Sequence, residues 1–337
     1  MPRAYALLRA GFPYVKSLGM RRVTSNPVDL AIGREGRLYV LCRGSLTVDI
    51  RRLTWDDEDL DVISGPGNAD GKLLWPANIL LDGNDTLYVS DEGRHCISMF
   101  STAGDYLGKW GEHGSGAGQF NRPSGLAFDP EGNLYVVDTL NHRIQQYTKD
   151  GGFRKQWGSF GSGEGEFNMP WGITVDDEGA VYVVDWRNDR VQKFDADGGF
   201  IAMFGSPGDG DGQFNRPTGI AVDGHGDIYV ADWGNNRVQL FDADGRYVEK
   251  FHGDATLSKM GRAYVLANPK PLRQREMANL EPQKRFRGPA SVRLDDAGRM
   301  YVADCGPHRI QVYQKDAVEL TPDQIIPPQN APSFSVA

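Results

Sequence analysis

The chain is built from short apolar segments separated by turns. Residues 219–223, 228–231, 237–241 and 247–251 show the pattern, because they are rich in Val, Ile, Tyr and Phe and are separated by Gly, Asp and Asn. Such segments favour β-strands bounded by turns. The Asp-Ala-Asp-Gly run at 242–245 is typical of a hairpin, since glycine adopts positive φ without strain. The pattern predicts a unit of four antiparallel strands.

This unit recurs along the chain. The segment from Pro170 reads PWGITVDDEGAVYVVDWRNDRVQKFDADGG, and that from Pro217 reads PTGIAVDGHGDIYVADWGNNRVQLFDADGR. Similar segments follow Pro123 and Pro289, and two weaker copies follow Pro27 and Pro76. Six four-stranded units without a helical period predict an all-β fold, a six-bladed β-propeller of four-stranded antiparallel blades.

The ring of blades needs a closing strand. Residues 11–19 resemble residues 245–253, which hold the fourth strand of the fifth unit, and the sixth copy has no comparable fourth strand. We therefore expect Tyr14–Leu18 to close the last blade, which also hides exposed sheet edges. Residues 1–320 form one propeller in this interpretation, with an insertion at 254–288 between blades five and six and a mobile tail at 321–337.

The repeated unit resembles the NHL repeat. The shared motif is P-x-G-[IL]-A-x-D-x-x-G-x-[IL]-Y-V-x-D-x-x-N-x-R-[IV]-Q-x-[FY], and the resemblance covers roughly residues 27–315. It implies the propeller fold but no single function, because proteins of this type include RNA-binding domains, protein-interaction scaffolds, extracellular sensor domains and the peptide-amidating lyase.

An Asp ends the second strand of most copies, and an Arg follows it by five residues. We interpret this repetition as a structural ion pair rather than a ring of catalytic acids, because a buried charge needs a partner. The repeated glycines two residues after the leading Pro are expected to allow close backbone approach near the axis. The Asp residues are Asp91, Asp138, Asp185, Asp232 and Asp304; the Arg residues are Arg143, Arg190, Arg237 and Arg309.

Three histidines share one position of the repeat. His95, His142 and His308 each stand four residues after the repeated Asp, and the loops that carry them meet at one face of a propeller. One interpretation is a structural or surface role. The other is metal binding, because zinc takes about three such ligands and a zinc-binding His of the amidating lyase has a comparable spacing.

Copies six, one and two depart from the repeat. Where the other copies have Gly, they carry Ser291, Asp29 and Asn78, and these copies are neighbours in a closed ring. Either these oxygen-bearing side chains form a ligand or Ca²⁺ site at the channel mouth, or the repeat has drifted where the chain ends meet. Trp171, Trp186 and Trp233 occupy loop positions and act either as binding anchors or in packing between blades.

The insertion differs from the rest of the chain in charge. It contains eight Lys and Arg against three Asp and Glu, a balance of +5 in a chain with a formal net charge of −8. We expect a short helix over 272–280 and a role as lid, partner contact or solvated loop. If the ligand is anionic, Arg273, Arg275 and Arg285 are the expected donors, because guanidinium groups bind carboxylate or phosphate bidentately.

The amino-acid composition limits the classes of function that the chain can have. The acidic balance, 37 Lys and Arg against 45 Asp and Glu, argues against nucleic acid, and no apolar run is long enough for a membrane span. Three cysteines without a paired spacing favour the cytoplasm. We expect a rigid scaffold that binds a protein, peptide or small molecule at the channel mouth. The alternative is a metal-dependent lyase or hydrolase with Zn or Ca at that mouth.

Overall fold

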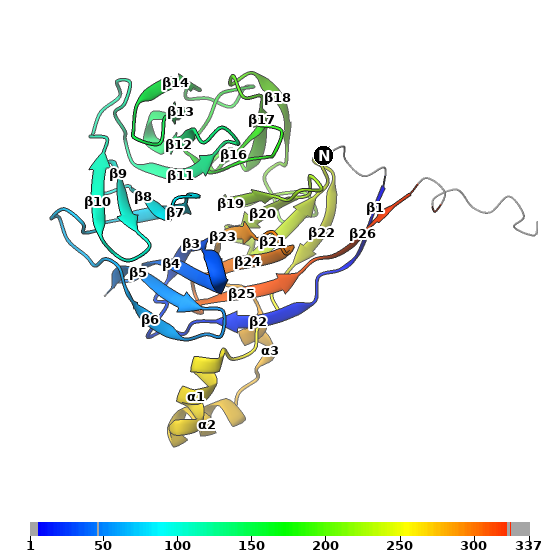
Figure 1. Ribbon diagram of the computed structural model, residues 1–337. Helices are drawn as coiled ribbons and strands as arrows, with labels where there is room; N and C mark the ends of the chain where they lie inside the picture. Colours follow the sequence, from blue (N-terminus) through cyan, green and yellow to red (C-terminus); the bar gives the residue numbers. More distant parts are fainter. Residues whose placement is uncertain (1–5, 46, 322–323, 325–337) are drawn as a thin grey trace, which may run out of the picture.

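Six four-stranded antiparallel sheets form a ring around a central axis (Figure 1). The structure, a computed structural model, describes residues 6–45, 47–321 and 324. The ring confirms the predicted six-bladed β-propeller. From the innermost strand outward, blade one contains β3 (Pro27–Ile32), β4 (Arg37–Arg43), β5 (Val48–Thr54) and β6 (Asp59–Val62), and blade two contains β7 (Pro76–Leu81), β8 (Thr86–Asp91), β9 (Cys96–Ser101) and β10 (Tyr106–Trp110). Blade three contains β11 (Pro123–Phe128), β12 (Leu134–Asp138), β13 (Arg143–Tyr147) and β14 (Phe153–Trp157), and blade four contains β15 (Pro170–Val175), β16 (Val181–Asp185), β17 (Arg190–Phe194) and β18 (Phe200–Phe204). Blade five contains β19 (Pro217–Val222), β20 (Ile228–Asp232), β21 (Arg237–Phe241) and β22 (Tyr247–Phe251), and blade six contains β23 (Pro289–Leu294), β24 (Arg299–Asp304), β25 (Arg309–Gln314) and β2 (Tyr14–Leu18).

The position of a strand within its blade explains its pattern of apolar residues. Every residue of β12 is buried, because the second strand has a neighbouring blade on both faces. The outermost strand β14 contains no fully buried residue, because much of it faces solvent. Each innermost strand begins with Pro, which is tolerated at the first residue of a strand because it lacks an N–H donor.

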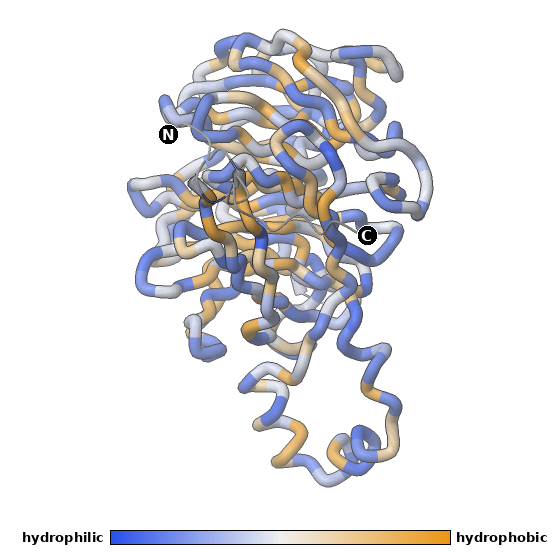
Figure 2. The backbone as a smooth tube through the Cα atoms, turned by 90° about the vertical axis from the view of Figure 1, so that its right-hand side faces the viewer, coloured by the Kyte–Doolittle hydropathy of each residue, from blue (hydrophilic) through white to orange (hydrophobic). Residues whose placement is uncertain are grey.

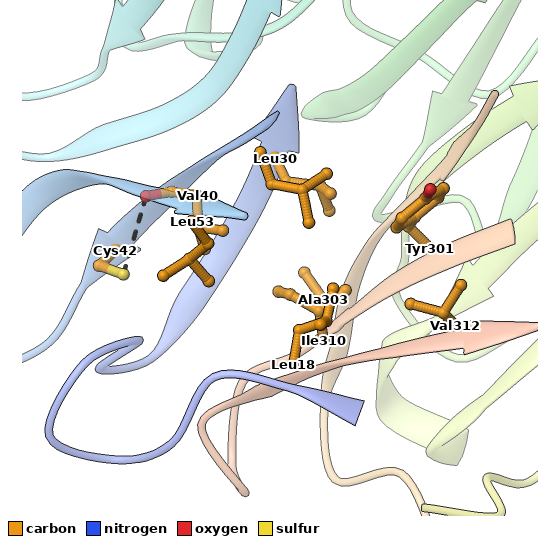
Figure 3. Packing of buried hydrophobic residues seen from close by; sticks show 10 residues of the cluster. Leu18, Leu30, Val40, Cys42, Leu53, Tyr301, Ala303, Ile310 and Val312 are labelled. Carbon is orange, nitrogen blue, oxygen red and sulfur yellow. Dashed lines mark hydrogen bonds between the residues drawn. The ribbon is translucent and has the colours of Figure 1, made fainter. Parts of the chain in front are cut away.

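The N-terminal strand closes the ring as predicted. β2 pairs with β25, with Tyr14 opposite Tyr313 and Leu18 opposite Ile310. Leu18 is completely buried in an apolar cluster that joins blade six to blade one (Figure 3). Closure therefore adds both a ladder of hydrogen bonds and a continuous core across the point where the chain ends meet.

A two-stranded ribbon outside the blades was not predicted. β1 (Ala6–Gly11) pairs with β26 (Asp316–Leu320), and its anchor is Asp227 of blade five. Arg9 bonds to that carboxylate, and Lys315 Nζ lies 2.8 Å from it. Apart from Thr321 and Gln324, the predicted mobile tail at 321–337 lies outside the described residues.

The insertion is helical and lies at the outer edge of the ring. It forms α1 (Lys259–Ala267), α2 (Pro269–Glu276) and α3 (Glu281–Lys284). The helix expected over 272–280 begins and ends earlier, because proline is accommodated in the first turn of a helix. In Figures 1 and 2 the insertion projects from the ring. None of the helices in the described ranges is long and apolar enough to cross a membrane.

Several hydrogen bonds attach the insertion across the closing strand. Thr256 N donates to the Tyr14 hydroxyl on β2 at 3.0 Å, and Met260 N donates to Asp57 Oδ2 of blade one at 2.7 Å. The segment leaves blade five, crosses the outer strand of blade six and reaches blade one. It therefore acts as a strap over the closure.

Candidate functional site at the channel mouth

The repeated Asp and Arg residues form buried structural networks in blades three to six. In blade four, Asp185 is fully buried and accepts hydrogen bonds from Arg190 Nε at 2.9 Å and Asn168 N at 2.7 Å. Arg190 in turn donates to the carbonyls of Ser162, Gly163 and Glu166 in the connector. Burial raises the pKa of Asp185 despite these donors. The networks pin each connector to its blade, which leaves these acids without access to a ligand.

Close packing near the axis explains the repeated glycines. A Cβ added at Gly172 would lie 2.1 Å from Thr218 O, and one at Gly219 would lie 2.6 Å from Ser291 Cα. Only glycine fits such an approach without a shift of the backbone. In blades six, one and two the corresponding positions carry Ser291, Asp29 and Asn78, so these side chains lie near the axis.

The structure gives Asp29 a partner that the sequence analysis did not foresee. Its carboxylate is fully buried and accepts hydrogen bonds from Arg293 Nε at 3.0 Å and Nη2 at 2.5 Å, and from Ile79 N at 2.9 Å. Asp29 does not line the central cavity. It joins blades one, two and six, which is a structural position rather than the expected ligand contact.

A cavity of about 770 Å³ opens at the mouth of the channel, and we refer to it as the channel-mouth pocket. It lies at the end where inner strands begin and second strands end, as the pairing of Pro76 with Asp91 shows. The residues that concern its chemistry are Trp75, Trp171, Trp186, Trp233, Asn78, Ser291, Arg293, Arg43, Glu92, Arg122 and Arg287. Its volume is typical of a small-molecule site.

The floor of the channel-mouth pocket is polar. The hydrogen bonds of Arg293 use Nε and Nη2, so Nη1 is the end of the guanidinium that can face a ligand. Ser291 Oγ is buried and has no hydrogen-bond partner among the described residues. Asn78 Oδ1 accepts from Leu126 N at 3.2 Å. A buried hydroxyl without a partner beside an arginine suits a ligand oxygen.

The walls of the pocket are aromatic. Trp171 and Trp186 lie with ring centroids 6.2 Å apart, and the guanidinium groups of Arg187 and Arg216 lie over Trp186 at 4.9 and 5.5 Å. Trp233 is 41% exposed although it lines the pocket. The structure thus brings the three predicted tryptophans to one cavity, with flat apolar surfaces open to a ligand.

The rim combines two arginines with one buried acid. Glu92 is almost completely buried, with Oε1 2.8 Å from Arg43 Nη1 and Oε2 2.9 Å from Arg122 Nε. Burial raises the pKa of Glu92, and the two guanidinium groups oppose that effect. Arg287 lines the same rim and forms no ion pair with any residue in the described part of the chain. The pocket carries more positive than negative groups in a protein of net charge −8.

The three arginines of the insertion that were predicted as anion donors do not reach this pocket. Arg273 and Arg275 lie on α2, and Arg285 follows α3; none of the three lines the cavity. The backbone carbonyl of Arg285 accepts from Arg309 Nη2 at 2.9 Å, which ties the end of the insertion to blade six. The path of the strap along the outer edge explains their distance from the axis.

The three histidines bridge neighbouring blades instead of gathering at one point. Nδ1 accepts from a backbone N–H of the following connector in each case: from Arg122 at 3.1 Å for His95, from Met169 at 3.1 Å for His142 and from Asn26 at 2.9 Å for His308. In blades four and five, Asp189 Oδ1 and Asn236 Oδ1 accept the equivalent bond. The shared position is therefore a structural acceptor.

The donor set does not fit the zinc or calcium site that the sequence suggested. No group of three His, Cys, Asp or Glu side chains able to hold a metal occurs within 6–45, 47–321 and 324. The Asp29 carboxylate is already neutralised by Arg293. Of the three predicted oxygen ligands, this leaves Asn78 and Ser291, and two neutral side chains are too few to account for a calcium site of six to eight ligands.

The histidine bridges predict a dependence of stability on pH. Burial lowers the pKa of His95, His142 and His308, so the folded protein binds fewer protons than the unfolded chain. Stability is therefore lost as the pH falls below the unfolded pKa of about 6.5. Replacing all three by Asn, the acceptor of blade five, should remove most of that loss in thermal melts between about pH 7.5 and 5.5. An equally steep loss in the triple variant would contradict the structural role.

Several pocket residues escaped the sequence analysis, although a signal for them exists. Arg43 and Glu92 directly follow the repeated Asp position, which holds Cys42 in blade one and Asp91 in blade two; in blades four and five the residues that follow it are Trp186 and Trp233. Because every blade places this repeat position in the same ring around the axis, comparing it across the copies would have identified Arg43 and Glu92. Arg293 gave no such signal, because it lies 264 residues from its partner Asp29.

Comparisons with known proteins agree with the geometry. The model of the NHL repeat matches residues 214–241 and 286–313, and the model of the SMP-30/Gluconolactonase/LRE-like region matches residues 116–211. Among curated protein sequences no relative was detected.

Solved structures share the fold at low identity. A gluconolactonase from Xanthomonas campestris is 13% identical, with a TM-score of 0.60 over 92% of this chain and 100% of that chain. A catalytically inactive virginiamycin B lyase from Staphylococcus aureus with quinupristin is 13% identical, with a TM-score of 0.57 over 90% of this chain and 99% of that chain. A chain of a nidogen/laminin complex is 21% identical, with a TM-score of 0.54 over 68% of this chain and 81% of that chain. From the repeat, the ring of blades and the family matches, the chain contains NHL repeats and folds as a six-bladed β-propeller.

Proposed function

We propose that the protein binds a small organic anion with a flat apolar body in the channel-mouth pocket. The observation that carries the proposal is the combination of tryptophan walls with Arg293 and the unpartnered Ser291 hydroxyl at the floor. A ligand carboxylate would reach Arg293 Nη1, and its body would stack against Trp171 and Trp186. Pockets with apolar walls and a few convergent polar groups are typical of small-molecule sites.

Electrostatics favours an anion over a cation. The described lining contains Arg43, Arg122, Arg287 and Arg293 and one acid, Glu92, which two of them hold. Arg293 is paired with Asp29, so the positive balance comes from Arg43, Arg122 and Arg287. A positive cleft in an acidic protein concentrates anionic ligands locally. The rigid blades beneath the pocket support binding without rearrangement, because buried networks pin the connectors of blades three to six. We also propose a cytoplasmic location, which the three free cysteines favour.

A lyase or hydrolase is the second candidate. It is favoured by the match to the SMP-30/Gluconolactonase/LRE-like region over residues 116–211. The residues of the pocket do not assemble the metal ligands that we expected for such an enzyme. Elemental analysis of untagged protein separates the candidates, because a stoichiometric Zn or Ca would support the enzyme and would contradict a pocket that uses arginine alone.

The binding proposal predicts a large effect of the tryptophans. In a thermal-shift and tryptophan-fluorescence screen, aromatic carboxylates such as indole-3-acetate should bind better than the neutral indole-3-ethanol. For any anion that binds, the double variant Trp171→Ala, Trp233→Ala should weaken binding at least about tenfold. The reason is that truncating a large aromatic anchor commonly costs about 2 kcal/mol or more of binding free energy.

The matched control is Phe160→Ala, since Phe160 is a 68% exposed aromatic residue that does not line the pocket. The Phe160→Ala variant should bind the same anion with the affinity of the wild type. Equal losses in the two variants, or tighter binding of the neutral analogue, would refute the proposal.

A further inference from the structure

A second cavity lies where the chain closes the ring, between blades six and one. It has a volume of about 870 Å³, and we refer to it as the seam groove. The residues that matter for its chemistry are Arg21, Arg22, Asn26, Arg43, Tyr264 and His308. No acidic side chain lines the groove in the described part of the chain.

The groove exists because one connector is short. The connectors into blades three, four and five run over 111–122, 158–169 and 205–216, twelve residues each, whereas that into blade one runs over 19–26, eight residues. In blade three the longer connector lies against the third strand, and Arg143 donates to its carbonyls at Ser115 and Gly116, both at 2.8 Å. Blade one lacks the four residues that would fill the equivalent space.

Blade one has also lost the side chain that holds such a connector. In blade three Asp138 pairs in register with Arg143, whereas in blade one Cys42 pairs with Asp49. Asp49 is almost completely buried, and its Oδ1 has no hydrogen-bond partner within the described ranges. The site that receives a peptide segment in the other blades is therefore rebuilt here, with an acid in place of the arginine.

The positive charge comes instead from the connector itself. Arg21 and Arg22 are exposed, and neither forms an ion pair with a described residue. The Arg22 guanidinium lies 4.8 Å from the ring centroid of Tyr264, on α1 of the strap, which holds it at the groove. The backbone of the short connector is fixed by Asn26 N donating to His308 Nδ1 and by Thr24 Oγ1 donating to His308 O at 2.8 Å.

We propose that the seam groove binds an extended acidic peptide segment of a partner protein. The peptide would lie along the groove, and its carboxylates would pair with Arg21 and Arg22. Charge complementarity favours this occupant over an apolar one, because Arg21 and Arg22 line the groove and no acidic side chain does so in the described part of the chain. The inference does not depend on the proposed function of the channel-mouth pocket, although the two cavities share Asn26 and Arg43.

The test uses the full chain and a fluorescein-labelled hexaglutamate peptide, with binding followed by fluorescence anisotropy at low ionic strength. Arg21→Glu with Arg22→Glu should weaken binding at least about tenfold, since two charge-assisted contacts become repulsive. The matched control is Arg273→Glu with Arg275→Glu, which makes the same change of charge at two α2 residues that do not line the groove. The control should bind like the wild type, and thermal melts should show both variants folded.

Three results would overturn the proposal. Equal losses of peptide affinity in both double variants would mean that binding depends only on the net charge of the protein. Full competition by millimolar inorganic phosphate would identify a small-anion site. Loss of peptide binding in the Trp171→Ala, Trp233→Ala variant would place the peptide in the channel-mouth pocket, whereas unchanged peptide binding in that variant supports a separate groove.

Discussion

A protein without residues 1–20 should fail to fold stably and should aggregate. The deletion removes β2, so β25 loses its ladder partner and becomes an exposed edge. It also removes Leu18 from the cluster that joins blades six and one, and Tyr14 from its contact with the strap. The combined loss is comparable with the total stability of about 5–15 kcal/mol of a typical domain. Size-exclusion chromatography and thermal melts measure the effect.

A shorter deletion separates closure from the other roles of the N-terminus. Removing residues 1–8 keeps β2 and keeps Arg9, which bonds to Asp227. That protein should remain monomeric and should melt close to the wild type, because most of the ribbon lies outside the blades. If the 1–20 deletion also stays monomeric with an unchanged melting temperature, β2 does not close the ring in solution.

Local repetition explains why most of the fold could be predicted. Blades three to five repeat every 47 residues, so strands and turns recur at fixed positions, and the likeness of 11–19 to 245–253 identified the closing strand. The ribbon of β1 and β26 has no counterpart in the repeat. Its pairing joins the two ends of the chain, and nothing local in either segment specifies a partner so distant in sequence.

Residues of the candidate site could be predicted only where a position of the repeat carries a side chain that the other copies lack. The tryptophans at 171, 186 and 233 stand out against the other copies, and the structure brings them to one pocket. Asp29 stood out equally, but its role depends on Arg293, a contact that only ring closure creates. The basic insertion was misplaced because its sequence fixes its charge but not its path, which is set by the hydrogen bonds to Tyr14 and Asp57.

The contrast between blades three to six and blade one suggests how the propeller separates stability from binding. Four blades use the Asp and Arg network to pin a connector, whereas blade one has Cys42 and Asp49 at those positions and leaves a groove open. A ring whose other blades are firmly held can tolerate one irregular blade. Function can therefore vary at the seam and at the mouth while the repeated networks maintain the scaffold.

The strength of those networks leads to the second large prediction, that Asp185→Ala destabilises the protein by about 3–5 kcal/mol. The change removes four hydrogen bonds, from Asn168 N, Asn188 Nδ2, Arg190 Nε and Gln192 Nε2, and leaves the buried Arg190 without its acid.

Urea unfolding of three variants measures this effect and tests its cause. The control, Asp197→Ala, removes a carboxylate that is 99% exposed and should change stability by less than about 0.5 kcal/mol. Adding Arg190→Met to Asp185→Ala should recover part of the lost stability, because an uncompensated buried charge costs more than an apolar replacement. Affinity for any channel-mouth ligand should stay unchanged in the folded single variant, since Asp185 does not line the pocket. A loss of affinity without a loss of stability would instead make Asp185 a binding residue.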